Sequence, residues 1–153
     1  QIQIGDAVVA ETHIVCHTCD LCHNGYEHVC YNTETIGASR DGALVEYVAI
    51  PAENAVVFKK FDSWEILSLM EPFVAAVHAV TQFPIYGKSV GVIGCGPIDC
   101  MRILIAKKCG ASKVIAIEPV EQRGKKALEV GADILINPIT VNIKQAVQDA
   151  NML

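Results

Sequence analysis

The stretch Ser89-Val-Gly-Val-Ile-Gly94-Cys-Gly96-Pro-Ile-Asp99 joins an apolar run to a glycine-rich turn that leads into a helical pattern. Gly94 permits a tight turn, and Gly96 allows a ligand to approach the backbone closely. The N-terminus of the following helix offers N–H groups that lack intrahelical partners, which favours an anion. We therefore expect a strand over residues 89–93, a helix over 98–109 and an anion-binding turn between them.

The same strand-then-helix rhythm continues along the chain. Strands are expected over residues 113–117 and 134–136, and helices over 121–130 and 141–150. Strands rich in β-branched residues that alternate with helices are typical of a parallel sheet covered on both faces. The predicted fold class for this part is α/β, with the first half of a Rossmann sheet and a turn placed where a dinucleotide's pyrophosphate binds.

Two residues beyond the turn favour NAD as the ligand. Glu118 ends the second strand about 20 residues after the turn, where a carboxylate accepts hydrogen bonds from the ribose hydroxyls of adenosine. The same charge repels a 2′-phosphate, so the sequence favours NAD over NADP. Arg123, in the first turn of the next helix, lies either near the adenine or its phosphate, or in solvent as an ordinary helix arginine.

Asp99 departs from the dinucleotide-binding pattern, because it stands where a third glycine is expected. An aspartate in the first turn of a helix suits the helix dipole, yet it adds bulk and negative charge close to the proposed pyrophosphate. We expect NAD to bind this chain more weakly than it binds an Asp99→Gly variant.

Residues 16–30 hold four cysteines with the spacing C-x2-C-x2-C-x7-C, namely Cys16, Cys19, Cys22 and Cys30. Four thiolates from one short loop match the closed tetrahedral site of a structural zinc ion. The alternatives are disulfides or buried unpaired thiols, which the dense local spacing disfavours in a chain without secretory features. The histidines in or beside the loop are expected in solvent rather than as ligands: His13, His17, His23 and His28.

The remaining composition narrows the class of protein. Apolar residues make up 52% of the chain and charged residues 19%, which predicts an ordered fold. A net charge of −5 without a basic block argues against nucleic acid and anionic membranes as partners. Seven cysteines fit a reducing compartment, so a cytoplasmic location is expected. The start at Gln1 instead of methionine is what we expect of a processed or cut chain.

The first third of the sequence reads as irregular, largely antiparallel β structure. Short strands are expected over residues 7–10, 43–50 and 55–58. Helices are then expected to begin at Ser63 and at Glu71.

Four features, taken in order, resemble a single family. They are the cysteine spacing, Gly42-Ala-Leu-Val-Glu-Tyr47, Glu71-Pro72 and Gly94-x-Gly96-Pro97. This series is similar to the zinc-dependent medium-chain dehydrogenases over essentially the whole chain, with the greatest likeness to their threonine branch. The resemblance implies a GroES-like β domain followed by a Rossmann domain. We expect partial versions of these over residues 1–70 and 71–153.

The resemblance also implies roles for individual residues. It makes the four cysteines ligands of a structural zinc ion and Glu71 the carboxylate ligand of a catalytic zinc ion. Without the resemblance, Glu71 reads as a helix-start carboxylate stabilised by the dipole. The implied NAD contacts are Gly94, Gly96, Pro97, Ile98, Glu118 and Arg123. The implied partners are a small alcohol substrate, with L-threonine favoured, and other copies of the chain, as a tetramer in an intact parent.

Several departures from the family qualify this reading. The chain lacks the cysteine and the Gly-His-Glu motif that supply the other catalytic ligands, and it shows three of the six Rossmann strands. Phe73-Val-Ala-Ala replaces a Gly-Asn segment of the threonine branch, and His17 stands where that branch commonly has glycine. We expect a fragment of a zinc- and NAD-dependent alcohol dehydrogenase that is inactive alone. The alternatives are a polyol dehydrogenase fragment and a non-catalytic, zinc-stabilised binding or assembly module.

Overall fold

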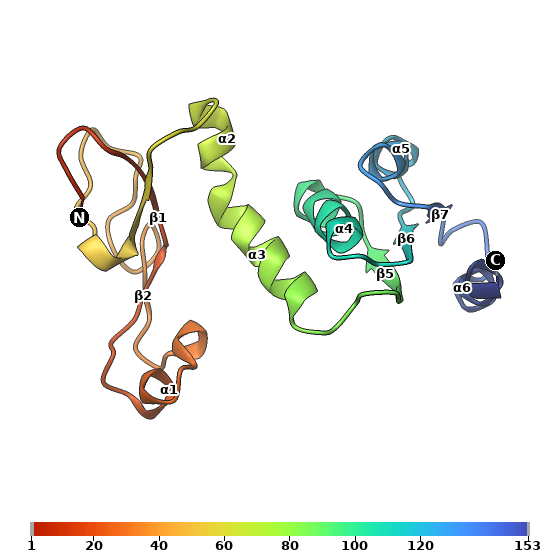
Figure 1. Ribbon diagram of the computed structural model, residues 1–153, viewed down its shortest axis with the longest axis horizontal. Coiled ribbons are helices and arrows are strands. Elements are labelled where there is room, and N and C mark those ends of the chain that lie inside the picture. The colour runs from red at the N-terminus through yellow and green to blue at the C-terminus, as the bar shows by residue number, and fades with distance from the viewer. Residues whose placement is uncertain (1, 153) are drawn as a thin grey trace. The chain divides into compact units, whose positions relative to one another are not determined.

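The computed structural model describes residues 2–152. The chain divides into two compact units, Gln1–Glu71 and Pro72–Leu153 (Figure 1). The division falls within the first turn of helix α3 (Met70–Thr81). Among the described residues, no helix combines the length and the apolar character that a membrane crossing needs.

The first unit contains two short antiparallel strand pairs. β1 (Ala7–Ala10) pairs with β4 (Ala55–Phe58), and β2 (His13–Ile14) pairs with β3 (Glu34–Thr35). Residues 16–30, which we call the cysteine lobe, lie between β2 and β3. The shorter elements are α1 (Asp20–His23), the 3-10 turn η1 (Glu27–Val29) and the 3-10 turn η2 (Ala52–Asn54). The strands expected over residues 7–10 and 55–58 are confirmed.

The strand expected over residues 43–50 is wrong. This segment forms bends and irregular backbone, with Leu44 and Tyr47 104% and 91% exposed. β-branched and aromatic residues favour a strand only when a neighbouring strand supplies hydrogen bonds and a packing surface. β1 and β4 pair with each other, and none of the described strands pairs with this segment.

Two helices follow the first unit's strands. α2 (Trp64–Ser68) begins after Ser63, whose hydroxyl oxygen accepts a hydrogen bond from the Ile66 N–H at 3.3 Å. α3 then carries Pro72 in its first turn, where the missing N–H removes no intrahelical bond. Both helices begin within one residue of the expected positions.

The second unit is a three-stranded parallel sheet in the order β5-β6-β7. Its strands are β5 (Ser89–Ile93), β6 (Lys113–Ile117) and β7 (Ile134–Ile136), and its helices after α3 are α4 (Pro97–Lys108), α5 (Glu121–Glu129) and α6 (Ile143–Met152). The expected strand boundaries are confirmed to the residue. In the register, Ile93 lies beside Ile117, and Ile117 beside Ile136.

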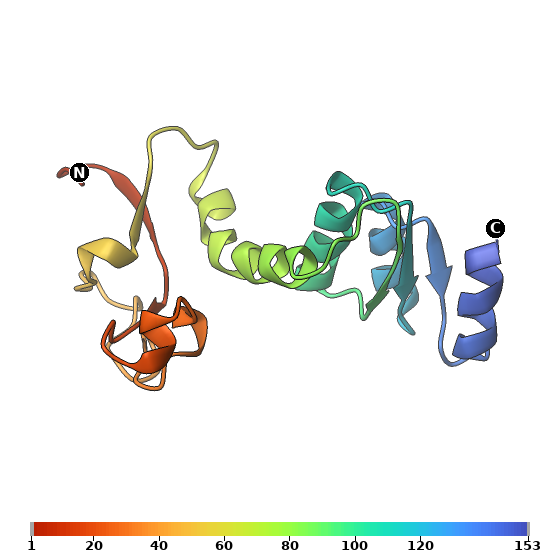
Figure 2. The ribbon, with the colours of Figure 1, turned by 60° about the horizontal axis from the view of Figure 1, so that its bottom comes forward.

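Helices cover both faces of this sheet, as Figures 1 and 2 show for α4 and α6. Alternate β6 residues explain the two faces. Val114 packs in the cluster that includes Ile103 of α4 and Ala127 of α5, whereas Ile115 packs with Ala150 of α6. Period-two alternation within a continuously apolar strand is typical of a sheet buried on both sides. The predicted α/β class is confirmed.

Candidate functional site

The glycine turn lies at the carboxyl end of β5. Gly94 adopts a φ of +88°, which an L side chain rarely tolerates, and its N–H donates to the Ile117 carbonyl at 2.9 Å. Gly96 precedes α4, whose first residue is Pro97, so the helix N-terminus faces the turn. Because neighbouring parallel strands end at the same edge, the end of β6 brings Glu118 beside this turn.

Glu118 is nearly buried, with 4% of its surface exposed, and both carboxylate oxygens accept backbone hydrogen bonds. Oε1 accepts from the Val120 N–H at 2.9 Å, and Oε2 accepts from the Cys95 N–H at 2.7 Å. The bond from Val120, with that from Cys95, lowers the pKa of this carboxyl in spite of its burial. Glu118 is therefore a charged group that fastens the glycine turn to the end of β6.

Asp99 also accepts a hydrogen bond from the turn. Its Oδ2 accepts from the Gly96 N–H at 3.1 Å, and its Oδ1 accepts from Nη1 of Arg102 at 2.9 Å. The first contact is the backbone half of a capping box, in which an acidic residue at the third helical position reaches back to the N-cap. The aspartate thus stabilises the start of α4 where the usual pattern has a glycine.

Three further predicted residues lie apart from this hydrogen-bond network. Ile98 is 38% exposed in the first turn of α4. Arg123 is exposed in the first turn of α5, and its charge helps to lower the pKa of Glu118. Glu71 is exposed at the start of α3. The described residues offer only one group of three or more potential metal ligands close enough to share an ion, and Glu71 is not part of it.

That one group is the four cysteines of the lobe, whose sulfur atoms all lie within 4.8 Å of one another. The Sγ–Sγ distances are 3.5 Å for Cys19–Cys22, 3.9 Å for Cys19–Cys30 and 3.5 Å for Cys16–Cys30. A disulfide needs about 2.05 Å, whereas four sulfurs at about 2.3 Å from a zinc ion are separated by about 3.8 Å. None of the seven cysteines is paired in a disulfide, so the structure favours the metal site over the disulfide alternative.

Backbone and side-chain donors around the sulfurs strengthen the fit to zinc. The N–H groups of Cys16 and Asn32 donate to Cys30 Sγ at 3.5 and 3.4 Å, and the Asn32 amide donates to Cys16 Sγ at 3.6 Å. Hydrogen bonds from Thr18 lower the pKa of Cys16 to about 5, while burial raises that of Cys22 to about 12. Four thiolates can occupy this space together only with a cation between them, and the cluster fits a structural zinc site.

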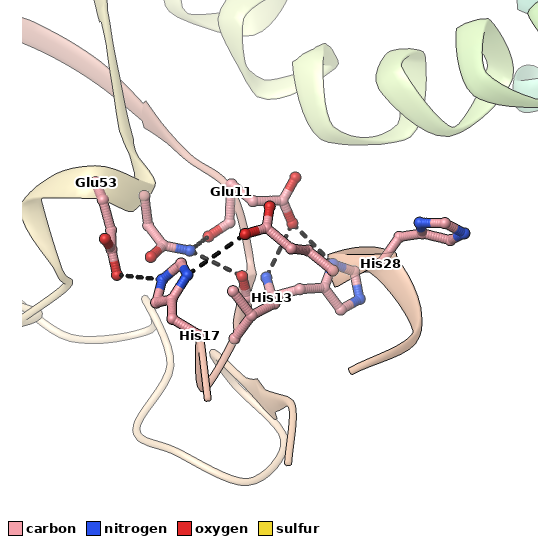
Figure 3. A pocket seen from close by; sticks show the side chains of 8 residues that line it. Glu11, His13, His17, His28 and Glu53 are labelled. Carbon is pink, nitrogen blue, oxygen red and sulfur yellow. Dashed lines mark hydrogen bonds and ion pairs between the residues drawn. The ribbon is translucent and has the colours of Figure 1, made fainter. Parts of the chain in front are cut away.

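Acidic and histidine side chains from the lobe and from the segments next to it form a group that the sequence did not predict (Figure 3). They line a pocket of about 500 Å³. His13 Nδ1 lies 2.7 Å from Glu11, while the two ring nitrogens of His17 lie 3.4 Å from Glu27 and 3.1 Å from Glu53. The contact with Glu53, followed by that with Glu27, raises the pKa of His17. Because Glu53 is 36 residues away along the chain, no local spacing could have predicted this contact.

His17 also has a backbone that only its surroundings explain. Its φ of +55° is the one positive value outside glycine among the described residues. An L side chain costs about 1 kcal/mol or more in this conformation. The carboxylates of Glu27 and Glu53 contact the ring of this residue from two sides.

Comparison with known proteins agrees with this geometry. Residues 1–60 match the alcohol dehydrogenase GroES-like domain. The L-threonine 3-dehydrogenase of Caldanaerobacter subterraneus subsp. tengcongensis is 44% identical over 142 residues, which are 93% of this chain and 41% of that protein. The chain therefore spans about two fifths of the length of the curated relatives it matches.

Solved structures show the same fold. A Thermotoga maritima protein assigned as an alcohol dehydrogenase has a TM-score of 0.89 and 35% identity, over 98% of this chain and 40% of that one. Galactitol-1-phosphate dehydrogenase from Escherichia coli has a TM-score of 0.89 and 28% identity, over 97% and 43%. An alcohol dehydrogenase from Escherichia coli CFT073, complexed with NADH, has a TM-score of 0.86 and 26% identity, over 97% of this chain and 44% of that one.

The GroES-like match and the half Rossmann sheet account for both units, and the cysteine lobe lies within the matched residues. Both units of the chain therefore match part of a zinc-dependent medium-chain dehydrogenase.

Proposed function

We propose that this chain forms part of an NAD- and zinc-dependent dehydrogenase that oxidises the secondary alcohol of L-threonine to 2-amino-3-oxobutyrate. The main support is that one chain holds both a cluster of four cysteines and a glycine turn with an acidic residue at the end of the neighbouring strand. The identity to an L-threonine 3-dehydrogenase supports the substrate.

In this proposal the two sites do different work. The four cysteines hold a zinc ion with no open position, so the lobe maintains structure and takes no part in the chemistry. The glycine turn and its flanking residues bind NAD, namely Gly94, Gly96, Pro97, Ile98, Glu118 and Arg123. NAD held by these residues would supply the acceptor for the hydride. The exposed position of Arg123 leaves its side chain accessible to an adenosine phosphate.

Glu71 is proposed as a ligand of a second, catalytic zinc ion, which as a Lewis acid would lower the pKa of the substrate hydroxyl. A catalytic zinc site uses three protein ligands and an open position. Among the described residues, Glu71 belongs to no group of three or more potential ligands that are close enough to share an ion. We therefore propose that the 153-residue chain is inactive alone and that an intact parent forms the catalytic site, as a homo-oligomer.

The test compares the intact parent with the 153-residue chain. The parent should form NADH with L-threonine and much less with sorbitol or a simple secondary alcohol. A preference for sorbitol would replace L-threonine by a polyol as the substrate, and turnover by the 153-residue chain itself would contradict the assignment of Glu71. A folded chain with one zinc ion and no affinity for NAD would instead favour a non-catalytic zinc module.

A further inference from the structure

The chain's own carboxylates occupy successive amides of the glycine turn. The Cys95 N–H donates to Glu118 at 2.7 Å, and the Gly96 N–H donates to Asp99 at 3.1 Å. In a dinucleotide-binding turn, the backbone at the second glycine is left bare so that a diphosphate can approach it. Here the Gly96 N–H already donates to a carboxylate of the protein itself.

The position of the Asp99 carboxylate shows which space it fills. A Cβ added to Gly94 would meet Asp99 Oδ2 at 3.3 Å, and a Cβ added to Gly96 would meet the same atom at 3.4 Å. The carboxylate therefore lies against both glycines, in the room that their missing side chains leave. Arg102 holds it there through Oδ1 at 2.9 Å.

We infer that Asp99 is an internal anion of the glycine turn, which competes with the cofactor's diphosphate for the Gly96 amide and the space between the two glycines. The inference rests on the proposed function, because it takes NAD as the ligand of this turn. The diphosphate either displaces the carboxylate from Gly96 or binds beside it against charge repulsion. Asp99 thereby sets how tightly the turn holds phosphate groups.

Competition by Asp99 can be told apart from a change in helix stability by how ligand affinity depends on phosphate. The competition concerns the phosphates, so the effect of Asp99 grows with the phosphate charge of the ligand. Adenosine has no phosphate and should be insensitive to Asp99, whereas ADP and NAD should both gain affinity when the carboxylate is removed. Repulsion between charges is screened by salt, so the gain should shrink as ionic strength rises.

The experiment measures the dissociation constants of NAD, ADP and adenosine by calorimetry for the 153-residue chain and three variants. Asp99→Gly removes the carboxylate and restores the glycine pattern, and Asp99→Asn removes the charge at similar size. Glu129→Gln is the matched control, because it removes one carboxylate at the far end of α5, where Glu129 pairs with Lys126. Melting temperatures establish that each variant is folded.

We expect Asp99→Gly to bind NAD and ADP about tenfold more tightly at low salt, with a smaller gain for Asp99→Asn and none for Glu129→Gln. Equal NAD affinities in the unsubstituted 153-residue chain and both Asp99 variants would overturn the inference and leave the proposed function standing. An equal gain for adenosine would also overturn it, since that gain has no connection with phosphate. If neither the chain nor any folded variant binds NAD, both the inference and the proposed cofactor site fail.

Discussion

The cysteine lobe and the glycine turn each gather several polar groups of one kind, but the groups of the lobe need a partner from outside the chain and those of the turn do not. The lobe gathers four sulfurs within 4.8 Å, and their charges require a cation that the chain does not supply. The turn gathers backbone N–H groups, and the chain supplies the anions itself through Glu118 and Asp99. We therefore expect the fold of the first unit to depend on an added ion, whereas the glycine turn of the second unit is held by side chains of the chain itself.

The largest expected effect comes from the lobe. Cys22→Ser removes one of the buried sulfurs, and the apparent free energy of structural zinc binding is about 10 kcal/mol or more near neutral pH. We expect loss of zinc and unfolding of the lobe, with the second unit unchanged. The zinc content per chain and the thermal unfolding transition of each unit measure these two effects. Cys109→Ser, at an exposed free cysteine, is the matched control. If the Cys22→Ser chain kept its zinc and the unfolding transition of its first unit, the fold of the lobe would not depend on zinc bound by the four cysteines.

Core truncation in the second unit should give the converse result. Ile103 is fully buried between α4 and the sheet, and its replacement by alanine should cost about 2–5 kcal/mol. The unfolding transition of the second unit should move, while the zinc content stays at that of the parent chain. Loss of zinc in Ile103→Ala would show that the two units do not fold independently.

Acid should act on the turn through Glu118. Its pKa is lowered below the usual 4.5 by the Val120 and Cys95 N–H groups, so its contribution to stability is present above pH 4.5 and is lost as the pH falls below that value. Glu118→Gln should lower the stability of the second unit by about 1–3 kcal/mol at neutral pH. The difference from the parent chain should narrow in denaturant titrations carried out below pH 4.5. A difference that stays constant with pH would contradict the charged assignment.

The smallest effect is expected at a site in the first unit that is remote in sequence from the cysteines. Ser63 caps α2 through Ile66, and Ser63→Ala should cost about 1 kcal/mol. The variant should melt slightly earlier and retain one zinc ion per chain. Ser68→Ala, at a serine inside α2 whose hydroxyl donates to the Glu65 carbonyl, is the control for serine removal without loss of the cap. An equal shift in both variants would contradict a specific role of the cap.

Local signals in the sequence were sufficient for the second unit. Val114 to Ile117 form a short apolar run between a turn and an acidic residue, and such a run becomes a buried parallel strand when helices flank it. The spacing of the four cysteines was sufficient for the lobe, because a metal site formed by one short loop is encoded locally. The helix start at Ser63 followed from side-chain capping, which is also local.

The remaining features depend on contacts that no local pattern contains. Leu44 and Tyr47 have strand-forming side chains, yet no described strand pairs with them, so β propensity alone misled. The sequence revealed the charge of Asp99, although its contact with Gly96 and its pairing with Arg102 required the structure. The Glu53–His17 contact joins residues that lie 36 positions apart in the sequence, so no local pattern predicts it.

Hydrogen exchange with and without a zinc chelator tests the contrast between lobe and turn most directly. Chelation should abolish amide protection across residues 16–30 and leave protection in β5, β6 and the start of α4 unchanged. Protection that persists in the cysteine lobe after zinc has been removed, or that is lost equally in both units, would contradict the account.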